Sequence, residues 1–589
     1  MPRRTKDQRL AEIHRLALEQ FEESFNATRE DRERARMARR FVNIRGAQWD
    51  WDEAGQFSNR MKLEIDHVAP AVIKIKNEFR KNRIAAVFNP KDGIEADALS
   101  DACAGRFRAD TMDQRGRDAR AMAFDCAVEG GFGGIRLRAE YESDKRQRVC
   151  LEAINDPEAT LFFDVNAKNK DKSDAEHAFL LTPWSRRAFE RKYGQEAANW
   201  PDMLAGQFKY GWFTTDTVIV AEYFVREDKT DKYRVFKGYG DEKEEFLEDE
   251  VTDEDIDRLT ATGFAEVEGR EEEIKRVVKY VMSGAKILSG PEELAGTEIP
   301  LVPQYGHRTV IDGVERFRGH VLKLVDSQIV YNLQVSKVGE TAAAAGIEKP
   351  IFLPQQIQAH AELWQNDHID NNAYLTVDPL IGPNGETIAQ GPVGFTKSPD
   401  VPQSVAELIA LTKADIAEQL GNQQNAETAE PDTSGVALEL VQNRIDMQTY
   451  GYLENAGESE RRLAEVWLGI ASVVYVENGR KLRTLDDDGK PGQVELGRKT
   501  MTKDGEVVDE VDFSRARFDI DFDIGPTSSS RRASIVRTVT GLMGQSDPET
   551  AVMLGHVALM NMEGEGLSDV REFSRKRLVA MGVIKPTRS

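Results

Sequence analysis

The residues best suited to chemistry are three aspartates in the segment 518–524, where Asp519, Asp521 and Asp523 alternate with apolar residues. On a β-strand their carboxylates would share one face, ~6 to 7 Å apart, which is close enough to hold a divalent ion for phosphoryl transfer. An amphipathic strand with a solvated acidic face has the same pattern, and no Lys, Arg or His constellation accompanies the aspartates. The sequence therefore favours the amphipathic strand, with a metal-dependent nuclease or phosphotransferase as the alternative.

Other patterns fit ligand sites less well. The glycine run 130–134 lacks the Lys and Ser/Thr of a phosphate-binding loop, and it precedes an expected strand rather than a helix. The segment from Asp164 opens like a calcium loop but has Asn169 at the sixth position and Ala175 at the twelfth. The eight histidines form no H-E-x-x-H motif, and no G-x-S-x-G motif occurs. We expect no catalytic residue, no metal and no cofactor.

The composition indicates a large, polar chain of several modules. Its 589 residues carry a formal net charge of −23, and 31% of them are charged. At ~100 to 200 residues per domain, this length corresponds to about three to five modules. The acidic balance argues against a protein that grips nucleic acid, because the mean field of the chain repels phosphate. It does not exclude DNA that passes through.

Cysteine spacing and hydropathy indicate the compartment. Cys103, Cys126 and Cys150 lie 23 and 24 residues apart without a C-x-x-C pair, so neither a disulfide framework nor a zinc knuckle is indicated. No apolar run approaches the ~18 to 20 residues of a membrane span, and the N-terminus lacks a signal-peptide core. We expect synthesis in a reducing cytoplasm and no contact with a membrane.

Hydrophobic periodicity predicts a mixed chain, with strands between helical ends. We expect helices over 1–40, 64–82, 95–128, 436–474 and 531–589. We expect strands over 135–140, 149–153, 159–163, 179–182, 218–225 and 277–281, and a hairpin-like region over 481–524. Residues 347–403 are rich in Pro, Gly, Asn and Gln and are too irregular for a long element.

A further long helix is expected after Gly319, because Pro300 and Pro303 keep the preceding segment extended. Beyond Gly319, apolar residues recur at steps of three and four in two adjacent stripes, which predicts two packing partners. The remaining polar face would border water or a channel, and it carries Lys323, Asp326, Ser327, Gln334 and Lys337.

The same stretch resembles the segment that marks portal proteins of short-tailed, podovirus-type bacteriophages. The residues that carry the resemblance are the run 315–319 followed by Asp326, Gln328, Tyr331, Asn332 and Ser336. Other pieces match in the same order, at 43–50, 82–90, 130–138, 163–175 and 525–532. The resemblance spans about residues 40–580, and it depends on this collinear order rather than on any one motif.

The resemblance implies an α+β fold with a wing of helices and strands, an α/β clip, a helical stem and a helical C-terminal crown. We accordingly expect a helical arm at 1–40, the first part of the wing at 41–228, a clip with a flanking stem helix at 229–300, a stem helix segment at 301–346, the second part of the wing with a tunnel-proximal loop and a long kinked helix at 347–530, and the crown at 531–589.

The resemblance also implies a ring of about twelve copies at one capsid vertex of the virion, through which genomic DNA enters and leaves. The expected partners are the major capsid protein and scaffold, the terminase large subunit, and head-to-tail adaptor or tail proteins. Double-stranded DNA would pass without sequence specificity, and ATP hydrolysis would belong to the terminase. A cytosolic scaffold without a channel is a further alternative.

Three sets of residues are candidates for this function. Lys323, Gln334 and Lys337 would line the channel, although a solvated stripe explains the two lysines equally well. Leu324, Tyr331, Val335 and Val338 of the stem helix would make subunit contacts. Glu244, Glu245, Glu248 and Asp249 would form an acidic clip surface for a basic motor or adaptor, or simply a solvated face.

Overall fold

The structure is a computed structural model in two units. It describes residues 6–91, 97–143, 145–201, 208, 210–237, 243–247, 265–344, 350–370, 374–396, 403–419, 435–486, 489–497, 499–501, 507–509, 511–515, 517–526, 536, 539–540, 542–543, 548–562, 568–581 and 583. Unit 1 comprises Met1–Arg39, Ala71–Leu322 and Glu439–Ser589, and unit 2 comprises Arg40–Pro70 and Lys323–Leu438.

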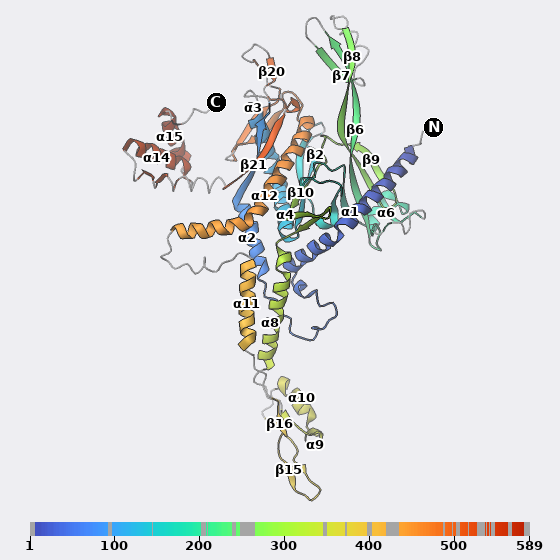
Figure 1. The fold of residues 1–589 in the computed structure, drawn as a ribbon, viewed down its shortest axis with the longest axis vertical. Coiled ribbons are helices and arrows are strands. Elements are labelled where there is room, and N and C mark those ends of the chain that lie inside the picture. Colours follow the sequence, from blue (N-terminus) through green and yellow to red (C-terminus); the bar gives the residue numbers. More distant parts are fainter. Residues whose placement is uncertain are drawn as a thin grey trace. The chain divides into compact units, whose positions relative to one another are not determined.

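Unit 1 is built largely from helices around several antiparallel sheets (Figure 1). Its helices, three of which cross a unit boundary, are α1 (Lys6–Asn43), α2 (Val68–Lys81), α3 (Asp97–Thr111), α4 (Gln114–Glu129), α5 (Pro157–Thr160), α6 (Arg186–Tyr193), α12 (Gly435–Val474), α14 (Pro548–Asn561) and α15 (Ser568–Ala580). Short 3-10 turns lie at Glu196–Ala198 (η3), Val321–Lys323 (η4) and Phe513–Arg515 (η6).

The largest sheet of unit 1 has six strands in the order β4-β5-β6-β8-β9, with β7 paired to β6. Its strands are β4 (Leu161–Phe163), β5 (His177–Ser185), β6 (Thr217–Lys237), β7 (Lys243–Leu247), β8 (Ala265–Ser283) and β9 (Ile287–Glu293). β6 and β8 pair antiparallel from Val220 opposite Ser283 to Lys237 opposite Ala265, so they form one long two-stranded ribbon that continues the sheet (Figure 1).

Smaller sheets complete unit 1. A three-stranded sheet has the order β10-β2-β3, and the others are strand pairs. The strands are β2 (Phe132–Tyr141), β3 (Gln147–Ala153) and β10 (Leu301–Tyr305), and the pairs are β1 (Asn82–Pro90) with β21 (Phe518–Pro526), β11 (His307–Ile311) with β12 (Val314–Arg318), β17 (Lys481–Leu485) with β18 (Pro491–Glu495), and β19 (Lys499–Met501) with β20 (Val507–Asp509).

The C-terminal half of α12 lies in the main core of unit 1. Leu463, Trp467 and Ile470 recur at steps of four and three, so they share one helix face, and all three are buried. Phe107 of α3 and Phe518 of β21 belong to the same buried cluster. The helix thereby joins parts of the sequence more than 300 residues apart.

Unit 2 contains two longer helices, α8 (Val325–Ala344) and α11 (Gln403–Gln419), which pack against each other (Figure 1). The segment Ala47–Trp49 (η1) contacts α8. Between α8 and α11 in the sequence lies a small α/β element, residues 350–396, here called the 350–396 module. Its elements are β13 (Pro350–Ile351), α9 (Pro354–Ile357), α10 (Ala361–Asp370), β14 (Leu380–Ile381), β15 (Thr387–Ala389) and β16 (Gly394–Phe395).

The mixed α+β class is confirmed, and the expected helix at 436–474 is α12. Three local expectations differ. The segment 82–90, for which no strand was expected, is β1, which pairs with β21. The expected helix 95–128 breaks between α3 and α4, because the Asp113 side chain accepts the Gly116 N–H as an N-cap. The helix after Gly319 begins only at Val325, behind η4.

The range 229–300 was expected to hold a clip and a stem helix. Its described residues are instead the strands β6 to β9 and their connections, without a helix among them. The charged run 270–276 shows no apolar alternation, so the strand pattern was hidden in the sequence. Across the described residues, no helix has the length and apolar character needed to cross a membrane.

Candidate functional site

A row of polar side chains runs along one face of α8. The row consists of Gln328, Asn332, Ser336 and Glu340, which are four residues apart and therefore lie above one another on the helix. Each accepts a hydrogen bond from a backbone N–H of an alternate residue in the segment 61–67: His67 to Gln328 (3.1 Å), Ile65 to Asn332 (3.2 Å), Leu63 to Ser336 (3.0 Å) and Met61 to Glu340 (3.0 Å). We call this arrangement the α8 ladder.

The ladder requires an extended backbone at 61–67. Four helical residues advance by ~6 Å, and two residues of an extended strand advance by about 6.6 Å, so the two repeats match closely. The segment runs antiparallel to α8, because His67 bonds near the start of the helix and Met61 near its end. Side chains of a helix thus replace the neighbouring strand of a sheet.

The two amides of the ladder are buried and make further hydrogen bonds. Gln328 Nε2 donates to the carbonyl of Ile65 at 2.7 Å and to Asn332 Oδ1 at 3.0 Å. Asn332 Nδ2 donates to Gln48 Oε1 at 2.6 Å. A buried polar group that loses its hydrogen-bond partner is destabilising. These contacts therefore favour the one arrangement in which Gln328 and Asn332 are both paired.

The expected stem-contact residues differ in their surroundings. Tyr331 is buried, and its ring lies 4.8 Å from that of His67 in the same chain. Burial and, to a smaller degree, the charge of Lys413 lower the pKa of His67, which favours the neutral imidazole. Leu324 is buried, whereas Val335 and Val338 are half-buried. Their role between subunits stays a prediction.

The expected channel residues do not lie on one uninterrupted helix. Lys323 ends the 3-10 turn η4, whereas Lys337 is exposed on α8. Gln334 is half-buried and accepts a hydrogen bond from the Thr412 hydroxyl of α11 at 3.3 Å. The structure therefore brings Gln334 to α11, and a channel role for these three residues stays a prediction.

Two of the four acidic residues expected to receive a partner, Glu244 and Glu245, lie on β7 in unit 1. In the register of β7 with β6, Glu244 and Glu245 lie opposite Phe236 and Val235. Glu248 and Asp249 lie outside the described residues.

The three aspartates on β21 form an acidic strand face. Asp519, Asp521 and Asp523 are exposed, whereas the adjacent Phe518 and Ile520 are buried. In the part of the chain that the structure describes, no group of three or more His, Cys, Asp or Glu could hold a metal ion. The alternation of exposed aspartates with buried apolar residues is that of an amphipathic strand.

Buried ion pairs anchor α12 within unit 1. Arg462 binds Glu298 at 2.8 Å and Glu465 at 3.1 Å. Arg226 of β6 binds the same Glu298 at 2.5 Å. Because a buried charge left unpaired is strongly destabilising, this chain of pairs fixes the position of α12 against β6 and the segment before β10.

A buried carboxyl group, Asp110, lies where α3 meets the end of α12. Its carboxylate accepts hydrogen bonds from Trp467 Nε1 at 3.0 Å and the Tyr475 hydroxyl at 2.9 Å, and it pairs with Arg106 at 2.5 Å. Burial nevertheless raises the pKa of Asp110 to about 6, because the apolar surroundings disfavour the charged form. The group therefore titrates in mildly acidic solution.

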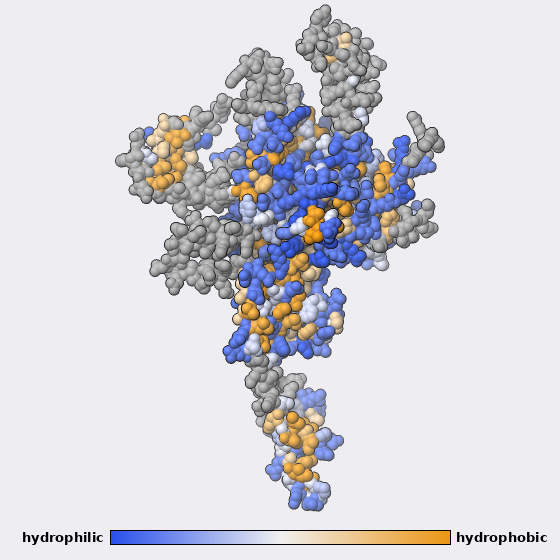
Figure 2. Space-filling model, in the orientation of Figure 1, coloured by the Kyte–Doolittle hydropathy of each residue, from blue (hydrophilic) through white to orange (hydrophobic). Residues whose placement is uncertain are grey.

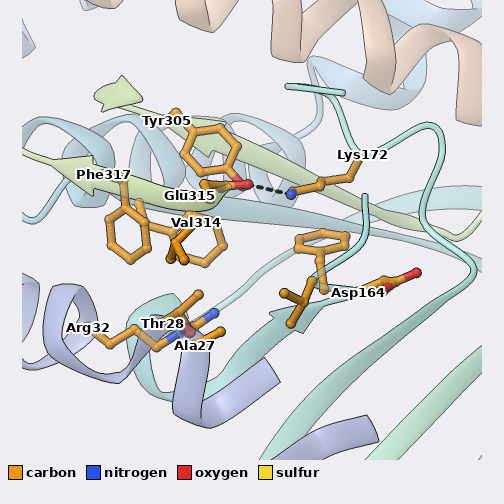
Figure 3. Close-up of a pocket in the computed structure, with 12 residues that line it drawn as sticks. Ala27, Thr28, Arg32, Asp164, Lys172, Tyr305, Val314, Glu315 and Phe317 are labelled. Carbon is orange, nitrogen blue, oxygen red and sulfur yellow. Dashed lines mark hydrogen bonds and ion pairs between the residues drawn. The ribbon is translucent and has the colours of Figure 1, made fainter. Parts of the chain in front are cut away.

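A small pocket in unit 1 lies between α1, β12 and the loop that contains Lys172 (Figure 3). Its volume is about 30 Å³, comparable to the space of one water molecule. Arg32 lies 3.8 Å from the centre of the Phe162 ring, and Lys172 pairs with Glu315 at 2.5 Å. Although burial opposes it, the charge of Lys172 lowers the pKa of Glu315. We interpret this pocket as a packing feature, because it is too small for a substrate.

Sequence reasoning missed the α8 ladder. Gln328, Asn332 and Ser336 belong to the motif that carries the resemblance, but no contacts were predicted for them. A signal was present, because Gln328, Asn332, Ser336 and Glu340 recur at steps of four, outside the expected polar face of the helix. The partner segment also carried a signal, because Met61, Leu63 and Ile65 alternate with charged residues as in a strand, although a helix was expected from residue 64.

Comparison with known proteins identifies a family and a curated relative. The family model described as Phage P22-like portal protein matches residues 18–588. A protein named "Portal protein" from Acyrthosiphon pisum secondary endosymbiont phage 1 is 33% identical, over 98% of this chain and 82% of that protein. Both matches extend over nearly the whole chain, so they include both units.

Proposed function

Since the chain belongs to the family of P22-like phage portal proteins, we propose that about twelve copies form a closed ring at one capsid vertex. Genomic DNA passes through this ring during packaging and ejection. The observation that carries the proposal is the family match over residues 18–588. The protein is a structural component of the phage and not an enzyme.

In this ring, we assign the stem to α8 and α11 and the clip to the 350–396 module, in place of the range 229–300. The resemblance implies a small α/β clip between two stem helices. Two helices of 20 and 17 residues flank the 350–396 module in the sequence, and they pack against each other. The ribbon β6–β8 then belongs to the wing.

The surface of the 350–396 module supports a role in contacts with other chains. Figure 2 shows apolar residues gathered on it, and Ile381 and Ile388 are 62% and 65% exposed. Strand pairs of two or three residues are too short to be stable without further packing. We therefore assign neighbouring copies, the terminase large subunit and the adaptor or tail proteins to this surface.

The charge of the 350–396 module suits a channel through which DNA slides. Its sequence contains no Lys or Arg. It contains five acidic residues, which are Glu362, Asp367, Asp370, Asp378 and Glu386. Each phosphate neutralised by a cation would add adhesion that depends on salt. Lys323 and Lys337 remain the proposed positive exceptions in the channel, with Gln334 beside them.

The remaining proposed contacts follow from the portal vertex. We assign the major capsid protein and the scaffold to the wing, and the acidic residues of the ribbon, including Glu244 and Glu245, to a basic partner. A wing position for these residues implies a partner other than the motor, because we assign the motor to the 350–396 module.

The mass of the purified protein in solution tests the ring. Twelve copies of 66.1 kDa give about 793 kDa, which light scattering measures directly. Electron microscopy of the same fraction should show rings with a central hole. A protein that stays at 66.1 kDa even with scaffold and capsid protein present would contradict the proposal.

A further inference from the structure

The segment 61–67 has one edge on α8 and one open edge. In an extended chain, the N–H and C=O groups of successive residues point to opposite sides. The backbone groups that point to the α8 ladder are those of Met61, Leu63, Ile65 and His67. The N–H and C=O groups that point away from the ladder are therefore those of Lys62, Glu64 and Asp66. None of these three N–H groups has a hydrogen-bond partner among the described residues.

Two apolar side chains are exposed beside this edge, together with the charged Lys62. Met61 and Ile65 lie on the same face of the extended segment and are 43% and 41% exposed. Soluble proteins usually protect an open edge with proline, charged side chains, a bulge or a covering element, because unpaired backbone groups bind other strands. Here 61–66 contains no proline, and its charged side chains are engaged within the chain: Lys62 pairs with Asp52, Glu64 accepts from Gly46, and Asp66 accepts from Val68. The edge is therefore suited to receive a strand.

A second open edge lies on another part of the same chain. β11 and β12 form a sheet of their own, joined by the two-residue turn Asp312 and Gly313 with φ of 53° and 75°. In such a hairpin, Ile311 and Val314, which flank the turn, form hydrogen bonds with each other, and so does every second pair beyond them. Val310 and Arg308 lie between these bonded positions, so their N–H and C=O groups point away from β12. Val310 and Ile311 are 55% and 58% exposed.

We propose that, in the ring, the edge at 62–66 of one copy pairs with β11 of the neighbouring copy. This inference rests on the proposed function, because the ring supplies the neighbour. A closed ring needs a head-to-tail contact between two different surfaces of the chain, and these two edges are different surfaces. Pairing of the 62–66 edge with itself would give a two-fold dimer and not a ring. The neighbour's β11 thus completes a sheet whose other side is the α8 ladder.

Hydrogen exchange read residue by residue tests the pairing in the full-length protein, with monomer and ring fractions compared. The amides of Lys62, Glu64, Asp66, Arg308 and Val310 should exchange at least about tenfold more slowly in the ring. The amides of Met61, Leu63 and Ile65 are an internal control, because the α8 ladder should protect them in both fractions.

Each outcome decides the inference separately from the proposed function. If rings form but the amides of Lys62, Glu64 and Asp66 exchange equally fast in both fractions, the pairing is wrong and the portal function stands. If these amides are already slow in the monomer, another segment of the same chain covers the edge and the pairing is wrong. If no ring forms, the proposed function fails first.

A proline variant gives a second, independent test. Lys62→Pro removes one outward N–H, whereas Lys62→Ala removes the same side chain and its pairing with Asp52 but keeps that N–H. We expect Lys62→Pro to lower the ring fraction at least about fivefold relative to Lys62→Ala. Equal ring fractions, with monomers of equal thermal stability, would overturn the pairing.

Discussion

The ladder residues Gln328 and Asn332 illustrate how single side chains acquire their role from a distant segment. Both are amides on the face of α8 that bonds to the segment 61–67, and both are buried. Each donates as well as accepts, so a substitution on α8 leaves groups of the segment 61–67 unpaired. Their presence in the motif that resembles portal proteins therefore has a physical explanation: they hold an extended segment on the helix.

Removal of the Asn332 amide should loosen the segment 61–67. Asn332→Ala leaves the Ile65 N–H and the Gln48 side chain without their partner, which should cost ~1 to 3 kcal/mol per unpaired buried group. Urea unfolding should show the loss, and hydrogen exchange at Ile65 should accelerate. The control is Thr341→Ala on the exposed side of the same helix, which should change neither quantity. Unchanged exchange at Ile65 would contradict the ladder.

Asp110 should make stability depend on pH in a direction opposite to most carboxyl groups. Its pKa is about 6 in the folded protein, against an ordinary value of 3.8, so the folded state holds a proton that the unfolded state has released. The contribution of this proton to the free energy of unfolding is therefore fully present below about pH 3.8 and is lost as the pH rises through about 6.

We expect Asp110→Asn to lose this dependence. Relative to the variant, the natural protein should gain unfolding free energy between pH 7.5 and pH 5, measured by urea unfolding at both values. Asp118→Asn, an exposed change one helix away, serves as the control and should follow the natural protein. A difference between the natural protein and Asp110→Asn that is the same at both pH values would show that Asp110 does not titrate in this range.

At the scale of elements, α12 shows how one long helix organises unit 1. Its apolar face enters the main core, and its arginines bind acidic groups of other segments. Two of its glycines face different surroundings. A Cβ on Gly457 would lie 2.3 Å from Phe522 Cδ2 of β21, whereas a Cβ on Gly451 would have no atom within 4 Å. The first glycine permits close packing, and the second has no such role.

Substitution of these two glycines should therefore have opposite effects. Gly457→Ala should cost about 1 to 3 kcal/mol, because the added methyl group clashes with the Phe522 ring. Gly451→Ala should be neutral or stabilise by up to ~1 kcal/mol, because alanine favours helix. Thermal unfolding of both variants measures the difference, and Phe522→Leu combined with Gly457→Ala should recover part of the loss. Equal effects of the two substitutions would refute the close contact.

For the whole molecule, the net charge determines how an assembled ring would interact with DNA. A chain with a net charge of −23 repels DNA on average, so a few cations in a channel would be the main points of attraction. Lys337 is exposed on α8, which we assign to the stem, and Lys323 lies just before that helix. Their proposed effect is on DNA and not on folding.

Reversal of both charges tests this role. The double variant Lys323→Glu and Lys337→Glu should form rings of unchanged mass but alter the amount of DNA packaged or retained per capsid. Packaging assays and the DNA content of purified particles measure this, and light scattering confirms the ring. The double variant Lys323→Gln and Lys337→Gln, which removes charge without reversing it, should have a smaller effect. Normal DNA filling in both variants would exclude a channel role.

The sequence by itself determined the α+β class, the helix α12 and the acidic face of β21. These features depend on local periodicity and on collinear motifs, which are readable without contacts. It also indicated the portal family, which the comparisons confirm. Only the tertiary structure decided where the strands of the charged ribbon β6–β8 pair, because both strands carry long polar runs and their pairing depends on partners up to 63 residues apart, from Val220 to Ser283. It also decided that the described residues within 350–396 form short helices and strands and that 61–67 lies along α8. The physical reason is that the hydrogen bonds between 61–67 and α8 join residues 261 to 279 positions apart, so neither local pattern identifies its partner.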